Sequence, residues 1–402
     1  MNKPKLAKVF FINLISQALP FLTVFYITRL YTPEDFSIFG SITSYAAFAL
    51  VLCTLRLEHS LIQITDDTLK NKLVGSMLTL SFFISIVMSM IFSVLIMSFD
   101  FDIFLYCALL LLSMSSFGVI TNYAVSEDNI NGLLYIRLAK GFLDAFAPIL
   151  TYWVLSDYRG LVIGLFISYI LSISVMFLKN IDKFSFDASV LKEYVSKFSK
   201  YDVMNGALNA AANALPVIVI TALHQPVYAG AFAFLNRYFA AVASFAMNSL
   251  GVVYRTSAMK EINQHGNFKK STEKTIVYGF FMALAFLFIV AGFQYIGFEK
   301  ILGPNWTVLN DISIIVGVLY AFKIVYLPIG YSFYIKGQVV KNLKIQIFLF
   351  AISLTASCAC YLVNEFNYSV YIFCIMLSAF YAFNIFYVLK LSSSESTVTE
   401  GK

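Results

Sequence analysis

Stretches of about twenty apolar residues recur along almost the whole chain, and this feature decides what the chain can fold into. A helix rises about 1.5 Å per residue, so roughly twenty residues cross the hydrocarbon core of a bilayer. Charged residues make up only 12% of the 402-residue sequence, whereas soluble domains carry about 25%. Polar surface is too scarce to coat a water-soluble body. We therefore predict an all-α integral membrane protein.

The apolar stretches predict about twelve membrane-spanning helices. They lie at 9–28, 36–55, 73–98, 103–125, 138–156, 161–178, 202–224, 227–254, 276–298, 312–335, 343–363 and 370–389. The first stretch is too long for the apolar part of a signal peptide, and no small-residue cleavage site ends it, so we expect an uncleaved helix. The fifth stretch has the least defined start, because Arg137, Lys140 and Asp144 crowd it.

Lysine and arginine are distributed unevenly between the two predicted faces. With a cytoplasmic N-terminus and alternating spans, nearly all of the 28 Lys and Arg residues fall in inner segments. The outer loops hold only Arg29, Arg159 and Lys300, and Arg237 and Lys323 lie inside spans. Basic loops stay in the cytoplasm, so we expect both termini there. The net charge of +6 then belongs to the cytoplasmic face, and no nucleic-acid partner is expected.

Residues 179–201 mix basic and aromatic side chains and are expected to lie along the inner membrane interface. They divide the predicted helices into two six-helix lobes. The predicted organisation is an N-lobe at 1–180, a cytoplasmic interlobe loop at 181–201, a C-lobe at 202–390 and a cytoplasmic tail at 391–402.

The first and seventh stretches share a pattern at one constant offset, which predicts a parallel duplication of the two halves. Two amides and then Ala-Leu-Pro occur in both, as Asn13, Gln17 and Pro20 in the first and as Asn209, Asn213 and Pro216 in the seventh. Parallel repeats build transporters whose halves rock about a central site. Since a proline inside a helix removes a backbone hydrogen bond, we expect Pro20 and Pro216 to act as hinges.

Asn205 extends the amide pattern of the seventh stretch, because Asn205, Asn209 and Asn213 are spaced by four and share one helical face. Amides that faced lipid would leave hydrogen bonds unmade, so these faces should point inward. Two interpretations stay open. The amides either hold helices together or, with Asn13 and Gln17, line a polar cavity, and the matching prolines favour the cavity.

Arg237 and Lys323 lie near the middle of the eighth and tenth stretches. A basic side chain at that depth costs roughly 2.5–3.5 kcal/mol on insertion scales, so each should face a wet interior or a partner. One interpretation is a structural ion pair with Asp144 or Glu58, acids that could also exchange protons. The other is a cationic cavity for an anionic headgroup.

Arg29 and Arg56 stand at helix ends. Snorkelling or membrane orientation would explain both as well as a substrate contact would.

The remaining motifs argue against an enzyme. The five cysteines lie in apolar stretches, so no disulfides are expected, and the three histidines are too scattered for a metal site. No nucleotide-binding loop, zinc motif or nucleophile elbow occurs. We expect no cofactor. Active transport would draw its energy from an ion gradient, such as H⁺ or Na⁺, or from consumption of the substrate downstream.

The segment 29–36 reads Arg-Leu-Tyr-Thr-Pro-Glu-Asp-Phe. It predicts a helix start, because Thr32 can cap, Pro33 suits the first turn and two acids complement the helix dipole. It closely resembles the corresponding segment of the O-antigen and capsule flippases (Wzx-type) of the multidrug/oligosaccharidyl-lipid/polysaccharide (MOP) exporter superfamily. Residues 54–58, Thr-Leu-Arg-Leu-Glu, resemble the next recurring segment of that family.

The resemblance implies a MOP/MATE-like fold in the bacterial inner membrane. It implies that an undecaprenyl-pyrophosphate-linked oligosaccharide, an O-antigen (lipopolysaccharide) or capsule repeat unit, is moved from the cytoplasmic to the periplasmic leaflet by alternating access. Partners would be that substrate, membrane lipids and other membrane proteins of polysaccharide assembly.

The same resemblance assigns expected roles to the polar residues. Arg237 and Lys323 would compensate the pyrophosphate, with Arg29 and Arg56 as weaker candidates. The five amides would bind sugar hydroxyls. Four tyrosines could stack on sugars, namely Tyr26, Tyr45, Tyr238 and Tyr320.

The sequence also bears on three rival interpretations. A MATE-type exporter of a small molecule should have a cavity dominated by acids, whereas the deep charges here lean basic. A major-facilitator transporter should carry a Gly/Asp/Arg-rich loop after its second span, and 58–72 lacks one. A membrane polysaccharide polymerase would need a large outer loop, and the longest one predicted, at about 299–311, is short.

Overall fold

The computed structural model describes residues 3–96, 99–363 and 365–394, and among these it leaves aside the side chains of 3–11, 13–14, 95–96 and 197–200. The described residues are almost entirely helical and include no β-strand. Their contacts form two compact units, Met1–Ala214 and Leu215–Lys402.

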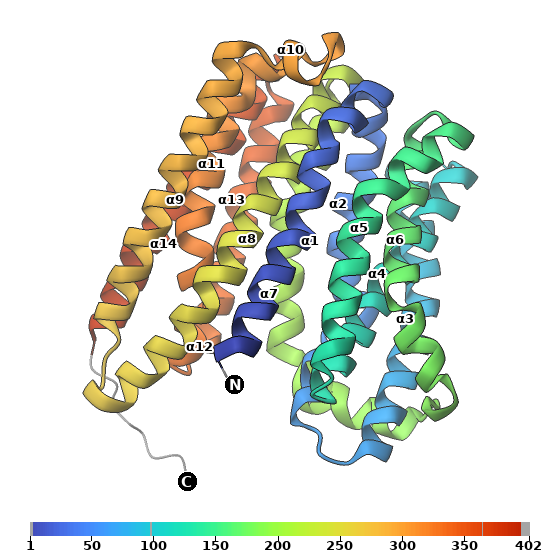
Figure 1. Ribbon diagram of the computed structural model, residues 1–402. Coiled ribbons are helices and arrows are strands. Elements are labelled where there is room, and N and C mark those ends of the chain that lie inside the picture. The colour runs from blue at the N-terminus through green and yellow to red at the C-terminus, as the bar shows by residue number, and fades with distance from the viewer. Residues whose placement is uncertain (1–2, 97–98, 364, 395–402) are drawn as a thin grey trace. The chain divides into compact units, whose positions relative to one another are not determined.

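The first unit is a helical bundle in which α5 packs against both α1 and α6, and α4 packs against α3 and α6. Two 3-10 helices, η1 (Leu57–Gln63) and η2 (Ile181–Lys183), join helices at one end of it. The long helices, coloured blue to green in Figure 1, are α1 (Lys3–Leu30), α2 (Pro33–Thr54), α3 (Asp67–Ile96), α4 (Phe101–Ser126), α5 (Ile130–Leu155), α6 (Tyr158–Asn180) and the first part of α7 (Ala188–Leu223).

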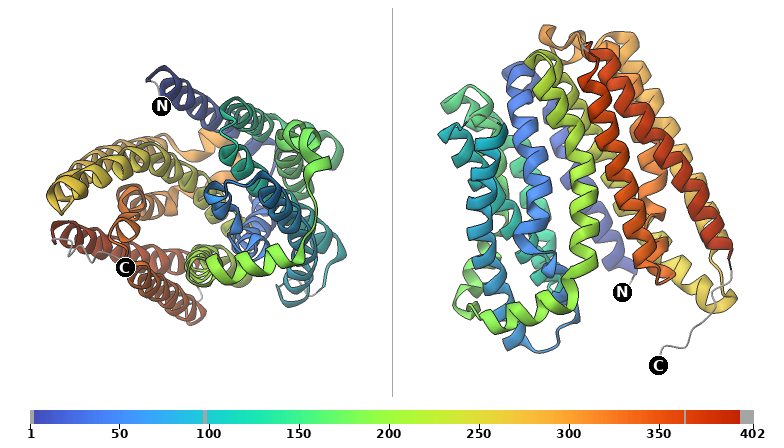
Figure 2. Two further views of the ribbon diagram at one scale, coloured as in Figure 1. Left: turned by 90° about the horizontal axis from the view of Figure 1, so that it is seen from below. Right: turned by 180° about the vertical axis from the view of Figure 1, so that it is seen from behind.

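The second unit is built around α11, which packs against α8, α9 and α14 and has most of its residues buried. The end-on view in Figure 2 lets this arrangement be followed. The elements after α7 are α8 (Pro226–His265), α9 (Lys269–Ile296), α10 (Phe298–Leu302), η3 (Pro304–Trp306), α11 (Leu309–Ile329), α12 (Ser332–Ile335), α13 (Val339–Tyr361) and α14 (Phe366–Ser393).

Among the described residues, nine helices are long and apolar enough to cross a membrane. They are α2, α3, α4, α6, the part of α7 from Tyr201, α9, α11 with α12, α13 and α14. The all-α membrane class predicted from the sequence is confirmed. Helices α1, α5 and α8 coincide with the other three apolar stretches but are outside that group, so the count of twelve stays a prediction.

The segment predicted as an interlobe loop is helical in its second half. Helix α7 begins at Ala188 and runs without a break to Leu223. Asp187 explains the start, because its carboxylate accepts hydrogen bonds from the backbone N–H groups of Ser189 (3.0 Å) and Val190 (3.3 Å). The boundary between the compact units, after Ala214, therefore falls inside a helix.

Asp187 also holds α7 to α3. Its carboxylate lies 3.0 Å from the Lys72 ammonium, and its backbone exchanges hydrogen bonds with the Ser76 hydroxyl. The Ser189 hydroxyl and the Lys72 ammonium hold the pKa of Asp187 well below its usual range. The carboxylate is therefore ionised at neutral pH, and its negative charge interacts favourably with the dipole at the start of α7.

The predicted start of α2 is confirmed. Thr32 accepts from the backbone N–H of Asp35 (3.4 Å), and the Asp35 carboxylate accepts from the backbone N–H of Thr32 (2.9 Å). The preceding Tyr31 is buried, and its hydroxyl donates to the carbonyl of Pro148 on α5 at 2.7 Å. This segment thus fastens the turn between α1 and α2 to the neighbouring helix.

The basic loops of the second unit gather at one end. The helix ends on either side of the turn between α8 and α9 carry Lys260, Lys269, Lys270 and Lys274. The Lys336 ammonium, in the turn before α13, lies 5.7 Å from the ring centre of Phe268 in the α8–α9 turn. In Figure 1 both turns lie at the lower ends of their helices.

Helices α5 and α6 approach closely at Gly164. A Cβ atom added there would lie 2.7 Å from the backbone nitrogen of Pro148 and 2.8 Å from its Cα atom. Small residues permit such close packing between membrane helices, where apolar side chains gain little by leaving lipid.

We expect Gly164→Ala to lower the melting temperature of the protein in detergent, because overpacking of a tight contact costs about 1–3 kcal/mol. Gly118→Ala in α4 is the matched control, since a Cβ atom there would meet no atom within 4 Å. Equal melting temperatures for the two variants would show that the α5–α6 contact is not close.

Candidate functional site

Lys323 lies on α11, the central helix of the second unit, and only 7% of its surface is exposed. Its ammonium nitrogen is 4.5 Å from the ring centre of Tyr320 and 5.7 Å from that of Tyr381 on α14. Cation–π contacts of this kind contribute about 2 kcal/mol when desolvated. The two rings therefore lower the cost of holding a cation inside an apolar bundle.

Tyr320 connects this cation to α8. Its hydroxyl donates to the side-chain oxygen of Asn236 at 2.5 Å and lies 3.0 Å from the Asn236 carbonyl. Asn236 directly precedes Arg237, which is half-buried. Tyr238 follows, with its ring centre 4.7 Å from that of Phe234.

Two of these residues were not predicted. Asn236 was overlooked although it stands beside a charged residue inside an apolar stretch, which is a usable signal. Tyr381 gave no such signal, because only the packing of α11 against α14 brings it to Lys323.

A second polar cluster lies inside the first unit, on α5 and α6. The Lys140 ammonium is 2.6 and 2.5 Å from the two carboxylate oxygens of Asp144. The Ser168 hydroxyl donates to the same carboxylate at 2.6 Å, and the Lys140 ammonium lies 3.8 Å from the ring centre of Tyr169. Asp144, predicted as a partner of a deep basic residue or as a proton carrier, is thus paired one turn away on its own helix. The spacing of four could have indicated this pair.

Arg56 stands at the end of α2 in an ion pair. Its Nε lies 3.0 Å from the carboxylate of Asp202 on α7, and its Nη2 lies 3.2 Å from the Nε2 of His59. Leu55 and Arg56 both adopt left-handed backbone conformations, with φ of 48° and 54°, which cost roughly 1–2 kcal/mol per residue. The ion pair helps to hold this strained turn.

Glu58 follows that turn and is mostly buried. One carboxylate oxygen lies 4.0 Å from the Nε2 of His59. The other is buried and has no hydrogen-bond partner among the described atoms.

The amide side chains predicted to line a cavity have different surroundings. Asn205 is buried, and neither polar atom of its amide has a hydrogen-bond partner in the described part of the chain. Asn213 donates to the Asn209 carbonyl at 2.8 Å, and Asn209 itself is exposed. Gln17 is half-buried with its side-chain oxygen unbonded within the described residues. The side chain of Asn13 lies outside them.

The remaining nominated residues lie in varied surroundings. Tyr45 is buried, stacks on Phe92 with ring centres 4.5 Å apart and donates to the carbonyl of Met88 at 2.7 Å. Tyr26 and Arg29 are exposed on α1. Pro20 and Pro216 both lie inside helices that continue past them.

No group of three or more His, Cys, Asp or Glu side chains that could hold a metal ion occurs in the described residues. The charged and aromatic side chains within the helices are therefore the candidate functional groups.

No protein-family model and no curated protein matches the sequence. Solved structures do match. The lipid II flippase MurJ, in an inward closed conformation, has a TM-score of 0.67 at 14% identity, covering 98% of this chain and 88% of the flippase.

Two structures of multidrug resistance MATE family transporters of the MOP superfamily are also similar. The inward-facing one has a TM-score of 0.52 at 12% identity, covering 96% of this chain and 100% of its own. The outward-facing one has a TM-score of 0.53 at 14% identity, covering 98% of each chain. The chain is thus a multi-pass membrane protein with the fold of the MOP-superfamily transporters.

We expect Asp144→Asn to destabilise the protein by about 3 kcal/mol, because it leaves the Lys140 charge without its carboxylate. The double variant Lys140→Met/Asp144→Leu should recover most of the loss, because it removes both charges. Thermal unfolding in detergent measures the difference.

Glu273→Gln is the control for this prediction. It breaks an exposed pair of the same spacing, with 3.6 Å between the Lys269 ammonium and the Glu273 carboxylate, and such pairs contribute little. If Asp144→Asn is as mild as this control, the buried pair is not a stability determinant.

Proposed function

We propose that the protein is a Wzx-type flippase. It moves an undecaprenyl-pyrophosphate-linked oligosaccharide from the cytoplasmic to the periplasmic leaflet of the bacterial inner membrane. The observation that carries the proposal is Lys323, a buried cation on the central helix of a unit within a MOP transporter fold. The likeness to a lipid II flippase over 98% of the chain supports it.

A buried lysine suits a pyrophosphate headgroup for electrostatic reasons. A cation inside a membrane protein is costly, and such residues commonly mark the paths of substrates or ions. Neutral aromatic rings moderate that cost by attracting the cation. The ammonium also offers three hydrogen-bond donors that can turn toward phosphate oxygens.

The contacts of the other basic residues decide how well each would suit the headgroup. Arg237 is the second candidate for the headgroup, because it follows Asn236, which Tyr320 holds near Lys323. Arg56 is engaged by Asp202, so we assign it to stabilising one conformation. Arg29 is exposed at the end of α1 and is the weakest candidate.

The polar side chains are assigned to the sugar and to coupling. The amides of Gln17, Asn205 and Asn209 are proposed to bind sugar hydroxyls. Glu58, with a buried unbonded carboxylate oxygen, is the better candidate for H⁺ or Na⁺ coupling, because Asp144 is already neutralised by Lys140.

A MATE-type exporter of a small molecule is the second candidate function. The likeness to MATE transporters over nearly the full length of both chains favours it. The two candidates differ in what accumulates when the gene is deleted. A flippase leaves lipid-linked repeat units in the cytoplasmic leaflet, whereas a drug exporter leaves the surface polysaccharide intact and sensitises the cell to toxic compounds.

We expect Lys323→Met to lower surface polysaccharide by roughly tenfold to a hundredfold. The reason is the loss of one hydrogen bond to a charged group, which contributes about 1.5–3 kcal/mol. Lys323→Arg should retain part of the activity, because it keeps the charge but changes its shape. The measurement is surface polysaccharide in the deletion strain complemented by each variant, with membrane insertion checked by immunoblot.

Lys300→Met, at a basic residue in a predicted outer loop, is the matched control and should behave as the wild type. Normal surface polysaccharide in both Lys323→Met and Arg237→Met would contradict the proposed headgroup site.

A further inference from the structure

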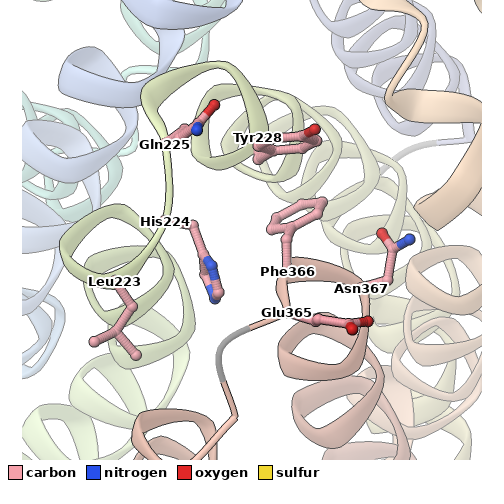
Figure 3. A pocket seen from close by; sticks show the side chains of 7 residues that line it. All are labelled: Leu223, His224, Gln225, Tyr228, Glu365, Phe366 and Asn367. Carbon is pink, nitrogen blue, oxygen red and sulfur yellow. The ribbon is translucent and has the colours of Figure 1, made fainter.

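A separate pocket lies at the other end of the second unit, between the turn joining α7 to α8 and the first turn of α14. Its volume is about 360 Å³, within the range of small-molecule sites. Figure 3 shows His224, Gln225 and Tyr228 along one wall, and Glu365, Phe366 and Asn367 along the other.

The pocket lies opposite the basic loops of its own unit. Helix α8 begins beside it at Pro226 and ends at His265, at the turn flanked by the lysines of α8 and α9. Helix α14 likewise begins at the pocket and ends beside that turn, where the backbone N–H of Phe268 donates to the Ser392 carbonyl. Under the orientation expected from the basic loops, the pocket faces the periplasm.

The apolar part of the pocket is held in place by ring contacts. The Phe366 ring centre lies 5.0 Å from that of Tyr228 and 5.6 Å from that of His224. The Nε2 of His224 also lies 2.9 Å from the Ser369 hydroxyl oxygen on α14. These contacts connect the two walls and give the pocket a preformed aromatic side.

The polar part combines two amides, a phenol and one carboxylate. The side chains of Gln225, Tyr228, Glu365 and Asn367 make no hydrogen bond to other described residues. Glu365 stands at the N-cap of α14 yet does not cap it with its side chain. Its carboxylate therefore remains available to a ligand, and so do the amides.

The charge of the pocket selects against an anion. The lining supplies the carboxyl group of Glu365 and no lysine or arginine side chain, so it offers no permanent positive charge to an anion. A pyrophosphate would be repelled. A metal ion would find too few ligands, because the lining supplies one carboxylate and one imidazole already directed at Ser369.

The geometry points to a site for a neutral sugar residue. Sugar hydroxyls both donate and accept hydrogen bonds, which suits amides and a carboxylate side by side. The C–H faces of a sugar ring pack against aromatic rings such as Tyr228 and Phe366. The glycan of the transported lipid would occupy the pocket on the outer side, an assignment of occupant that rests on the proposed function.

The test is saturation-transfer NMR on the full chain in nanodiscs. The neutral probes are the methyl glycosides of glucose, galactose, rhamnose and N-acetylglucosamine, and the charged probes are inorganic pyrophosphate and spermidine. We expect at least one neutral glycoside to bind. Tyr228→Ala and Asn367→Ala should each weaken that binding at least tenfold, and pyrophosphate should not compete.

Tyr368→Ala is the matched control. Tyr368 is an exposed tyrosine on α14, next to Asn367, and it lines a different, apolar groove. It should bind glycosides as the wild type does. The inference is overturned if no neutral glycoside binds, or if binding survives both Tyr228→Ala and Asn367→Ala. It is also overturned if only spermidine binds and Glu365→Gln abolishes that binding.

Lys323→Met separates this inference from the proposed function. It should lower export as predicted above but leave glycoside binding at the pocket unchanged. Loss of polysaccharide export in Lys323→Met without any glycoside binding by the wild type would remove only the sugar site. If the protein binds a glycoside but deletion of its gene leaves the export of lipid-linked repeat units normal, only the proposed flippase function is overturned.

Discussion

A polar group that enters the hydrocarbon core is costly unless it finds a partner inside the protein, because lipid offers no hydrogen bonds. The helical backbone satisfies its own groups. The hydroxyls of Ser113 and Thr275, both buried within spans, donate to carbonyls three or four residues earlier at 2.8 Å. Serine and threonine can therefore occupy these bundles at low cost, whereas amides and charged side chains require dedicated neighbours.

Lys140 and Lys323 meet this requirement in different ways. Lys140 is neutralised by the carboxylate of Asp144, so the cluster carries no net charge. Lys323 rests against the faces of Tyr320 and Tyr381, whose rings attract a cation but remain neutral. The first arrangement suits a structural element. Lys323 lies on α11, the central helix of its unit, and Lys140 is already paired with a carboxylate, which is why Lys323 and not Lys140 is proposed to meet an anionic substrate.

The sequence was informative wherever the cause of a structure is local. The apolar stretches correspond to the helices, and Thr32 caps α2 as expected, because span length and capping depend on neighbouring residues. The start of α7 was missed although Asp187 is a sufficient signal, since the basic and aromatic composition around it suggested a loop. The depth of Lys323 was predicted, but its contact with Tyr381 was not, because that pair depends on tertiary packing. For Tyr45 the family resemblance implies a sugar contact, and the structure adds a hydrogen bond from its hydroxyl to the Met88 carbonyl, which the sequence does not indicate.

The lysines at one end of the second unit also bear on how the chain is made. A nascent membrane protein is oriented largely by basic residues near the ends of its helices, read as each helix leaves the ribosome. The helix ends around the turn between α8 and α9 supply four lysines, far along the chain from the first helix. Basic residues placed late in a sequence can also influence membrane orientation. The second unit therefore carries basic residues of the kind that orient a helix, independently of those near the N-terminus.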